Sequence, residues 1–282
     1  MRCAWQSFID LLPDWMREFV VNNGKDSLQE LRLRVNMPPQ LKRNDGPVFM
    51  SRAVTNKDLN YCINAVTQYS PWSVATAANC YYTASGGHRI GICGNVIISN
   101  GQVVGMRELT SLCIRIARDF PGIAKPLSGL SGSLLIVGKP GSGKTTMLRD
   151  LIRQFSVHRH ECVSVVDERQ EIFPFYNGSF CFDTGLNTDV ISGCKKSEGI
   201  EAVLRNMGPS VIAVDEITAI NDCSALRAAV GCGVNLIATA HAESKEDLIR
   251  RPVYKSLIDA ELFENLLIMH PDKSWHLERI EQ

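Results

Sequence analysis

No apolar run in this sequence approaches the roughly 18 consecutive residues that a membrane-spanning helix needs. Residues 1–15 mix apolar side chains with Arg2, Asp10 and Asp14, which is not the pattern of a secretory signal peptide. Charge of one sign is not in excess either, because 30 basic residues balance 30 acidic ones. Bulk charge therefore provides no attraction to nucleic acid or to an anionic membrane surface, and we expect a cytoplasmic protein.

The ten cysteines include no C-x-x-C pair, so the sequence predicts no zinc site. Scattered thiols of this kind are typical of a reducing compartment. Internal repeats and low-complexity segments are also absent. What remains is an ordinary globular composition, with 45% hydrophobic and 21% charged residues. The chain is long enough for two domains.

One stretch fits the phosphate-loop pattern G-x-x-x-x-G-K-[ST] in full. The apolar residues 133–137 before it predict a buried strand, and residues 146–155 after it predict an amphipathic helix. In this context the glycines let backbone N–H groups surround a phosphate chain at the positive end of a helix. We expect Lys144 to reach the β- and γ-phosphates and the Thr145 hydroxyl to bind Mg²⁺. The sequence therefore predicts ATP and Mg²⁺ as cofactors, with the nucleotide bound by Gly138, Lys139, Pro140, Gly141, Ser142, Gly143, Lys144, Thr145 and Thr146.

Acidic residues follow two later apolar strands. Asp215 and Glu216 come directly after the strand predicted at residues 211–214, which is the arrangement of a Walker B site. There Asp215 would hold Mg²⁺, and Glu216 would orient or deprotonate the attacking water. Glu168 follows the strand predicted at residues 162–166 in the same way. It competes for the catalytic role, because adjacent parallel strands bring their carboxyl ends to one crevice.

A third strand, predicted at residues 234–239, ends in Thr239-Ala240-His241. Polar side chains at this place can contact the γ-phosphate and report its loss. His241 is therefore a candidate catalytic or sensing residue, and a purely structural histidine is the alternative.

The two halves of the chain differ in pattern. Residues 133–282 alternate apolar strands with helical segments at residues 198–207 and 222–230, which predicts a parallel sheet with helices on both faces. A hairpin over residues 263–280 is expected to close this half. Residues 1–120 predict a smaller α+β domain, and residues 121–132, rich in proline, glycine and serine, predict a linker. Within the smaller domain we expect helices at 9–20 and 56–68 and strands at 31–35, 81–84, 90–98, 102–104 and 111–118.

In this order, the motifs resemble those of the secretion ATPases of type II and type IV machines, which carry an acidic box and a histidine box at corresponding places. A closer resemblance, to the stage III sporulation protein AA family, spans nearly the whole chain. Its motifs are Glu30-Leu31-Arg32-Leu33-Arg34, Gly86-Gly87-His88-Arg89-Ile90-Gly91, Ile114-Arg115-Ile116-Ala117-Arg118, Val165-Val166-Asp167-Glu168-Arg169 and Val211-Ile212-Ala213-Val214-Asp215-Glu216. The resemblance implies a RecA-like P-loop NTPase domain that hydrolyses ATP. It also implies a motor for the channel between mother cell and forespore in endospore formation, attached to the membrane through proteins of that channel.

The same resemblance implies that the chain assembles into a homo-oligomeric ring, expected to be a hexamer, with nucleotide at the subunit interfaces. Arginines of a neighbouring subunit would complete the site, because the phosphoryl transition state spreads negative charge over its equatorial oxygens. Arg115 and Arg118 are the expected source, since their strand leads into the predicted linker. Arg169 and Arg205 are the rivals.

Two other functions are compatible with a phosphate loop. One is a nucleic-acid-binding ATPase, because related sequences are fused to modules that bind single-stranded nucleic acid. The zero net charge and the absence of such a module weigh against it, so no nucleic-acid partner is expected. The other is a scaffold that binds nucleotide without hydrolysing it, which the intact Lys144, Thr145, Asp215 and Glu216 disfavour. The transported substrate, the ring size, the partner surface and the role of the Gly86-Gly87-His88-Arg89 turn stay open.

Overall fold

The computed structural model describes residues 1–25, 27–43, 45–67 and 80–280. The chain divides into two compact units. The larger unit comprises Phe120–Phe173 and Asp183–Gln282, and the smaller comprises Met1–Asp119 together with Pro174–Phe182. The smaller unit therefore includes a segment that interrupts the sequence of the larger one.

The larger unit is built on a seven-stranded sheet with the strand order β11-β8-β12-β13-β7-β14-β15. Every neighbouring pair is parallel except β14 and β15, which form the expected antiparallel hairpin. The central strands are buried along their whole length, as strands covered on both faces must be. The seven strands of the sheet are Leu134–Gly138 (β7), Val163–Asp167 (β8), Thr188–Ser192 (β11), Val211–Val214 (β12), Asn235–Ala240 (β13), Asn265–Met269 (β14) and Trp275–Arg279 (β15).

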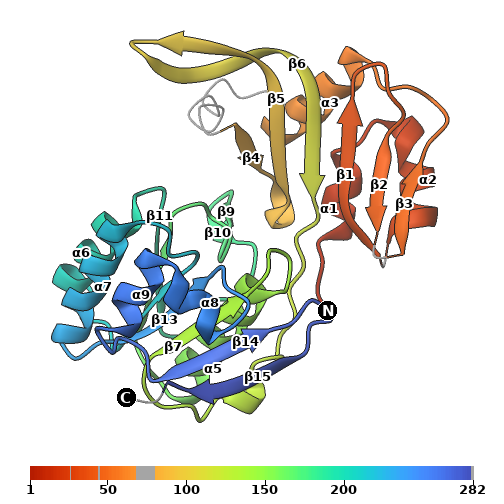
Figure 1. Ribbon diagram of the computed structural model, residues 1–282. Helices are drawn as coiled ribbons and strands as arrows, with labels where there is room; N and C mark the ends of the chain where they lie inside the picture. Colours follow the sequence, from red (N-terminus) through yellow and green to blue (C-terminus); the bar gives the residue numbers. More distant parts are fainter. Residues whose placement is uncertain (26, 44, 68–79, 281–282) are drawn as a thin grey trace. The chain divides into compact units, whose positions relative to one another are not determined.

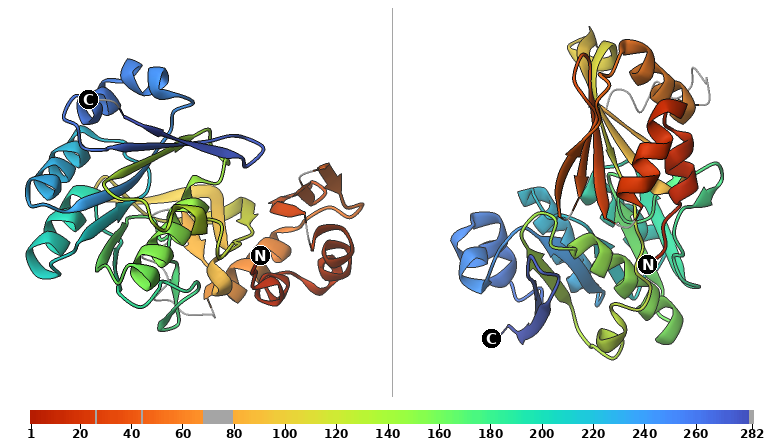
Figure 2. Two further views of the ribbon diagram at one scale, coloured as in Figure 1. Left: turned by 90° about the horizontal axis from the view of Figure 1, so that it is seen from below. Right: turned by 90° about the vertical axis from the view of Figure 1, so that its right-hand side faces the viewer.

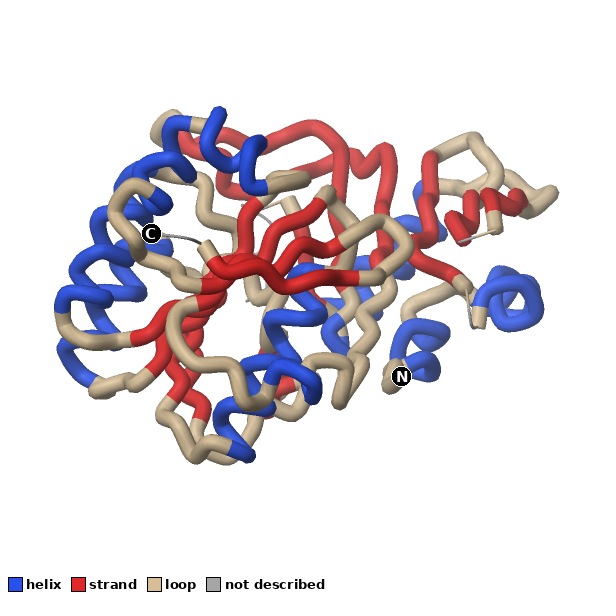
Figure 3. Tube along the Cα trace, turned by 60° about the horizontal axis from the view of Figure 1, so that its bottom comes forward, coloured by secondary structure: helices blue, strands red, loops and turns tan. Residues whose placement is uncertain are grey.

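Helices lie on both faces of this sheet (Figures 1 and 3). Alternate strand residues such as Leu135 and Val137 join a buried core with four helices, α6 to α9, on one face. The other face is covered by α5, whose buried side chains include Leu148, Leu151 and Phe155. The helices of this unit are Lys144–His158 (α5), Lys196–Asn206 (α6), Ile220–Gly231 (α7), Lys245–Arg250 (α8) and Pro252–Ile258 (α9).

The smaller unit contains a six-stranded antiparallel sheet with the order β3-β2-β1-β6-β5-β4. Its core joins one face of the sheet to the helices, which lie beside it in the right-hand view of Figure 2. The strands are Leu28–Arg34 (β1), Gln40–Arg43 (β2), Gly46–Phe49 (β3), Tyr81–Thr83 (β4), Arg89–Ser99 (β5) and Gln102–Arg115 (β6). The helices are Trp5–Asp10 (α1), Asp14–Gly24 (α2) and Asn56–Thr67 (α3).

Two sequence expectations in this unit are wrong. The single helix expected at residues 9–20 is two helices, because Pro13 adopts an extended conformation (φ −54°, ψ 143°) and cannot donate a helical hydrogen bond. The strands expected at 102–104 and 111–118 are one continuous strand, β6, that ends at Arg115. The helix expected at 56–68 is present as α3, and residue 68 lies outside the described residues.

The Gly86-Gly87-His88-Arg89 turn is a packing junction of the smaller unit. Gly86 and Gly87 have φ angles of +78° and +80°, a region that favours glycine. The fully buried His88 accepts a hydrogen bond from the Ala117 N–H at Nδ1 (3.1 Å), so its Nε2–H donates to the Ala4 carbonyl (3.0 Å). Burial lowers the pKa of His88, which keeps the ring neutral. The turn thereby ties the start of the chain to the end of the sheet.

Candidate nucleotide site

The phosphate loop lies between β7 and α5, and geometry requires two of its glycines. A Cβ atom at Gly138 would lie 2.6 Å from the Met269 carbonyl oxygen on the neighbouring strand β14. Gly143, the residue that precedes α5, has a φ of +104° in the left-handed region. α5 therefore begins at Lys144, slightly before the predicted start at residue 146, and its unpaired N–H groups open onto the loop.

Lys144 is hydrogen-bonded to the loop itself. Its ammonium group donates to the carbonyl oxygens of Gly138 (2.9 Å) and Lys139 (3.2 Å) and to Nδ1 of His241 (3.0 Å). Burial lowers the pKa of Lys144, and two nearby carboxylates oppose that effect. Each of these three acceptors is one that a phosphate oxygen can replace.

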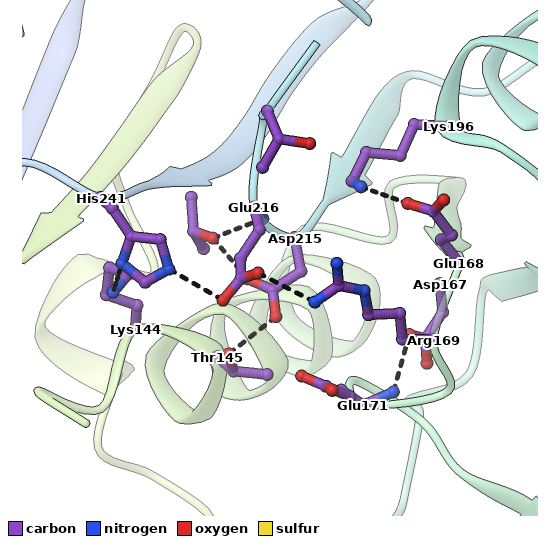
Figure 4. Close-up of polar contacts among 12 residues, drawn as sticks. Lys144, Thr145, Asp167, Glu168, Arg169, Glu171, Lys196, Asp215, Glu216 and His241 are labelled. Carbon is purple, nitrogen blue, oxygen red and sulfur yellow. Dashed lines mark hydrogen bonds and ion pairs between the residues drawn. The ribbon is translucent and has the colours of Figure 1, made fainter. Parts of the chain in front are cut away.

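Thr145 and Asp215 meet beside the loop. The Thr145 hydroxyl donates to one carboxylate oxygen of Asp215 at 2.7 Å (Figure 4), and the Thr239 hydroxyl donates to the other. A hydroxyl and a carboxylate next to a phosphate site are the protein ligands that Mg²⁺ commonly uses, with phosphate oxygens and water in its remaining positions. Within the described residues no cluster of three or more His, Cys, Asp or Glu side chains could hold a metal. The Thr145 hydroxyl and the Asp215 carboxylate fit Mg²⁺ that arrives with a nucleotide.

Glu216 is held from three directions. Its carboxylate accepts from Nε2 of His241 (2.9 Å) and pairs with Arg169 (3.4 Å), and its backbone N–H donates to Thr239 (2.8 Å). Because the Lys144 ammonium can only donate, it takes Nδ1 of His241 as an acceptor and leaves the proton on Nε2. Glu216 also has a φ of +50°, which is uncommon for a residue with a side chain and concentrates at functional sites.

Glu168 is placed differently from Glu216. It forms an ion pair with Lys196, whose side chain is only 6% exposed. The preceding Asp167 accepts hydrogen bonds from the backbone N–H groups of residues 171–173 and so shapes the loop after β8. Burial raises the pKa of Asp167 to about 6, although these hydrogen bonds oppose it. The structure thus gives Glu168 a fixed cationic partner and gives Asp167 a role in the loop.

A hollow opens where β8 and β12 end, and its lining is predominantly acidic. Carboxylates from the ends of both strands face it, with Arg169 and Lys196 as its cationic members. Such a surface repels a bare triphosphate and accepts one accompanied by Mg²⁺. The acidic residues are Asp167, Glu168, Glu171, Asp215 and Glu216.

The family model described as "Sporulation stage III, protein AA" matches residues 6–277. Stage III sporulation protein AA of Bacillus subtilis (strain 168) is 39% identical over 273 residues, which cover 92% of this chain and 88% of that protein. This chain belongs to the stage III sporulation protein AA family. The uncharacterized protein ycf45 of Porphyra purpurea is 27% identical over 268 residues, which cover 90% of this chain and 43% of that protein.

Solved structures identify the fold of this stage III AA family member. The ATPase DotB of Legionella pneumophila aligns with a TM-score of 0.58 at 16% identity, covering 95% of this chain and 80% of DotB. The pilus retraction motor PilT with bound ADP aligns with a TM-score of 0.59 at 15% identity, covering 89% and 76% of the two chains. Identities this low establish the fold alone. The expected α/β class, a RecA-like domain with a smaller α+β unit, is confirmed.

The two arginines expected to act on a neighbouring subunit belong to the smaller unit, whereas the phosphate loop and the Walker B residues belong to the larger one. Arg115 is exposed at the end of β6, and Arg118 donates to the Leu28 carbonyl, both within the smaller unit. Of the two rivals, Arg169 pairs with Glu216, and Arg205 forms an exposed pair with Glu201 on α6. Of the two arginines in the larger unit, Arg169 therefore contacts a Walker B carboxylate and Arg205 does not.

Sequence reasoning missed three contacts at the site. Lys196 pairs with Glu168, and Lys273 donates to the Gly141 carbonyl of the phosphate loop. The Thr239 hydroxyl accepts from the Glu216 backbone N–H and donates to the Asp215 carboxylate. Thr239 alone carried a signal, since it is a polar residue at the end of a buried strand beside the predicted Walker B strand. The two lysines lie in segments without a distinguishing pattern.

Proposed function

We propose that this protein hydrolyses ATP with Mg²⁺ and acts as a motor for a membrane-embedded channel or secretion complex during endospore formation. The observation that carries the proposal is the contact of Thr145 with Asp215 at 2.7 Å beside a phosphate loop, with Glu216 hydrogen-bonded to His241. Family membership supports the sporulation setting. The fold, shared with proteins described as ATPases and a motor, supports the class of activity.

Binding would begin at the N-terminus of α5, where backbone N–H groups face the β- and γ-phosphates. The Lys144 ammonium would exchange its loop carbonyls and His241 for phosphate oxygens. Mg²⁺, when bound, would neutralise charge on the β- and γ-oxygens, and Thr145 and Asp215 would be its protein ligands. Loss of Lys144 as a partner frees Nδ1 of His241, so the same imidazole can change partners when the γ-phosphate arrives or leaves.

Glu216 is proposed as the base that orients and deprotonates the attacking water. Its two carboxylate oxygens are already fixed by His241 and Arg169, which restricts the direction in which the remaining lone pairs accept a proton. Glu168 is the less suited candidate, because its partner is Lys196, whereas the His241 partner of Glu216 also contacts Lys144 of the phosphate loop.

The working assembly is proposed to be a homo-oligomeric ring, with six subunits expected, in which Arg115 or Arg118 of one subunit stabilises transition-state charge in the next. No helix among the described residues is long and apolar enough to cross a membrane. Attachment to the membrane is proposed to come through proteins of the channel, with the ATPase itself on the cytoplasmic side. The domains are proposed to divide the work, residues 133–282 for hydrolysis and residues 1–120 for assembly and partners.

Phosphate release from ATP and Mg²⁺ tests the activity directly. Lys144→Ala should abolish turnover, while Lys125→Ala, which removes an exposed lysine of the same unit, should leave it intact. Equal turnover in the Lys144→Ala variant and the wild type would refute the site. Nucleotide binding without any phosphate release, with or without assembly, would favour a scaffold. A salt-sensitive shift of single-stranded DNA in a gel would favour the nucleic-acid-binding alternative.

Mixing separates catalysis within one chain from catalysis across an interface. An Arg115→Ala/Arg118→Ala chain and a Lys144→Ala chain, each inactive alone, should recover partial turnover when assembled together. Recovery is expected because some interfaces then pair an intact arginine with an intact phosphate loop, and an arginine finger can contribute roughly 10³–10⁵ in rate. Normal turnover by the double arginine variant, or turnover per chain that is unchanged on dilution to monomer, would exclude the trans mechanism.

A further inference from the structure

The sheet hydrogen bonding between β12 and β13 stops just before the Walker B carboxylates. The last paired residues of these strands are Val214 and Ala238. Asp215 and Glu216 follow β12, and Thr239 follows Ala238 on β13. The catalytic segment therefore begins where the regular hydrogen bonding between these two strands ends. Something other than the ladder has to fix its direction.

Thr239 takes over at this point with both its side chain and its backbone. The Glu216 N–H donates to the Thr239 hydroxyl oxygen (2.8 Å), and the Ile217 N–H donates to the Thr239 carbonyl (3.0 Å). The Thr239 hydroxyl donates a hydrogen bond to the Asp215 carboxylate. One hydroxyl therefore contacts both acidic residues, as an acceptor for the backbone of one and as a donor to the carboxylate of the other.

The backbone of Glu216 shows why such a contact is needed. A φ of +50° is sterically unfavourable for a glutamate and persists only where neighbours hold it. Thr239 is fully buried, so its hydroxyl has no water to exchange with and its geometry is fixed by the sheet. The Glu216 side chain, in contrast, is partly exposed and reaches His241 and Arg169 from the site. The buried hydroxyl thus lies behind the residue whose carboxylate faces the chemistry.

We infer that Thr239 is a positioning residue for ATP hydrolysis, which holds Glu216 in its left-handed conformation and couples it to the metal-binding carboxylate of Asp215. The inference rests on the proposed function, since it assigns Thr239 a part in that reaction. Thr239 does not contact the nucleotide in this role. Its loss should misplace the general base without weakening the phosphate loop.

Thr239→Val tests the inference, because valine keeps the shape and the strand preference and removes only the hydroxyl. We expect kcat to fall about 10- to 100-fold, part of the 10²–10⁴-fold that a positioned acid or base contributes, while KM and the affinity for ATP change less than about threefold. Thr239→Ser should retain most of the turnover. The matched control is Thr188→Val, which removes a hydroxyl that bonds the Thr184 carbonyl near the edge strand β11.

A double-mutant cycle distinguishes action through Glu216 from any other effect. In a Glu216→Gln background, Thr239→Val should lower kcat by less than about threefold, because the carboxylate that Thr239 positions has already been removed. The inference would be overturned if Thr239→Val lowered kcat by a further 10- to 100-fold in the Glu216→Gln background. A kcat of Thr239→Val within twofold of the wild type would also overturn it, as would an equal loss of kcat in Thr239→Val and Thr239→Ser. If Thr239→Val does not fold, Thr239→Cys keeps the size with a weaker hydrogen bond and should lower kcat without changing KM. Absence of phosphate release by the wild-type protein would instead refute the proposed function.

Discussion

Substitution of Asp150 by asparagine should open the segment that leads into the larger unit. Asp150 lies on α5, is fully buried, and accepts hydrogen bonds from the N–H groups of Gly122 (2.9 and 3.0 Å) and Ala124 (2.8 Å). It also pairs with Arg153 at 2.7 Å, and that side chain is 7% exposed. One carboxylate therefore satisfies two backbone donors and one buried guanidinium.

Asparagine cannot reproduce this arrangement in either orientation. With its amide oxygen toward residues 122–124, the NH₂ group faces the Arg153 guanidinium, and two donors oppose each other. With the amide reversed, the NH₂ group faces the backbone N–H groups instead. Breaking a buried ion pair by removing one partner costs about 3–5 kcal/mol. Because one hydrogen-bonded set survives in each orientation, we expect about 3 kcal/mol.

Amide hydrogen exchange measures this locally, without assuming that a protein of two units unfolds in one step. At about 1.4 kcal/mol per tenfold, the peptide that contains Gly122 and Ala124 should exchange about 100-fold faster in Asp150→Asn. The matched control is Asp259→Asn, the same chemical change in an exposed i,i+4 pair with Lys255, where an effect below about 1 kcal/mol is expected. If the amides of this peptide exchange at equal rates in the two variants, the buried Asp150 carboxylate does not hold the segment.

Three further outcomes follow from the site and from buried titratable groups. Glu216→Gln should keep nucleotide binding and lower turnover about 10²–10⁴-fold, whereas loss of turnover in Glu168→Gln with near-normal Glu216→Gln would exchange their roles. Burial lowers the pKa of His88 below its ordinary 6.5, so its contribution to the stability of the smaller unit should be lost as pH falls below 6.5; denaturation should show this relative to His88→Gln, and a pH-independent difference would contradict it. Burial raises the pKa of Asp167 from 3.8 to about 6. The stability of the wild-type protein relative to Asp167→Asn should therefore be greatest below about pH 4 and fall by about 3 kcal/mol as pH rises to about 6. A difference that rises over that range would show that ionised Asp167 is favoured by the fold.

The sequence was informative wherever a buried parallel strand leads to a polar residue. The apolar runs before Gly138, Asp167 and Asp215 predict β7, β8 and β12, because a strand covered on both faces is apolar at every position. The strand order then brings their carboxyl ends to one edge. This rule and the spacing of the motifs were enough to predict that Thr145 and Asp215 lie close together.

Contacts between side chains distant in sequence were not predictable in the same way. Thr239 lies 23 residues from Glu216, and Lys196 lies 28 residues from Glu168. The strand end draws attention to Thr239 but does not indicate its partner, and Lys196 has no distinguishing pattern, because a hydroxyl or an ammonium group at a strand end or helix start is common. The positive φ of Glu216 was also invisible, since glutamate has no preference for it.

Fold elements were missed where tertiary contacts outweigh local pattern. β11 (Thr188–Ser192) pairs in parallel with β8 although it is half polar, as an edge strand can be. The strands Phe175–Tyr176 (β9) and Ser179–Phe180 (β10) form a two-stranded sheet too short for any periodicity. Their segment packs with the smaller unit, where a Cβ atom at Gly87 would lie 3.2 Å from Pro174. Only the folded chain reveals that membership.

The helix after the phosphate loop links these observations. Its first residue, Lys144, belongs to the nucleotide site, and Asp150 fixes residues 122–124, just after the boundary at Asp119. Arg149, next to Asp150, donates to the carbonyl oxygens of residues 171 (2.8 Å) and 172 (2.5 Å), just before the boundary at Phe173. Both of these chain crossings between the units are thus anchored to α5 by buried charged side chains. Asp150→Asn releases one anchor and leaves the other in place, so exchange should rise in residues 120–125 while residues 170–173 stay protected.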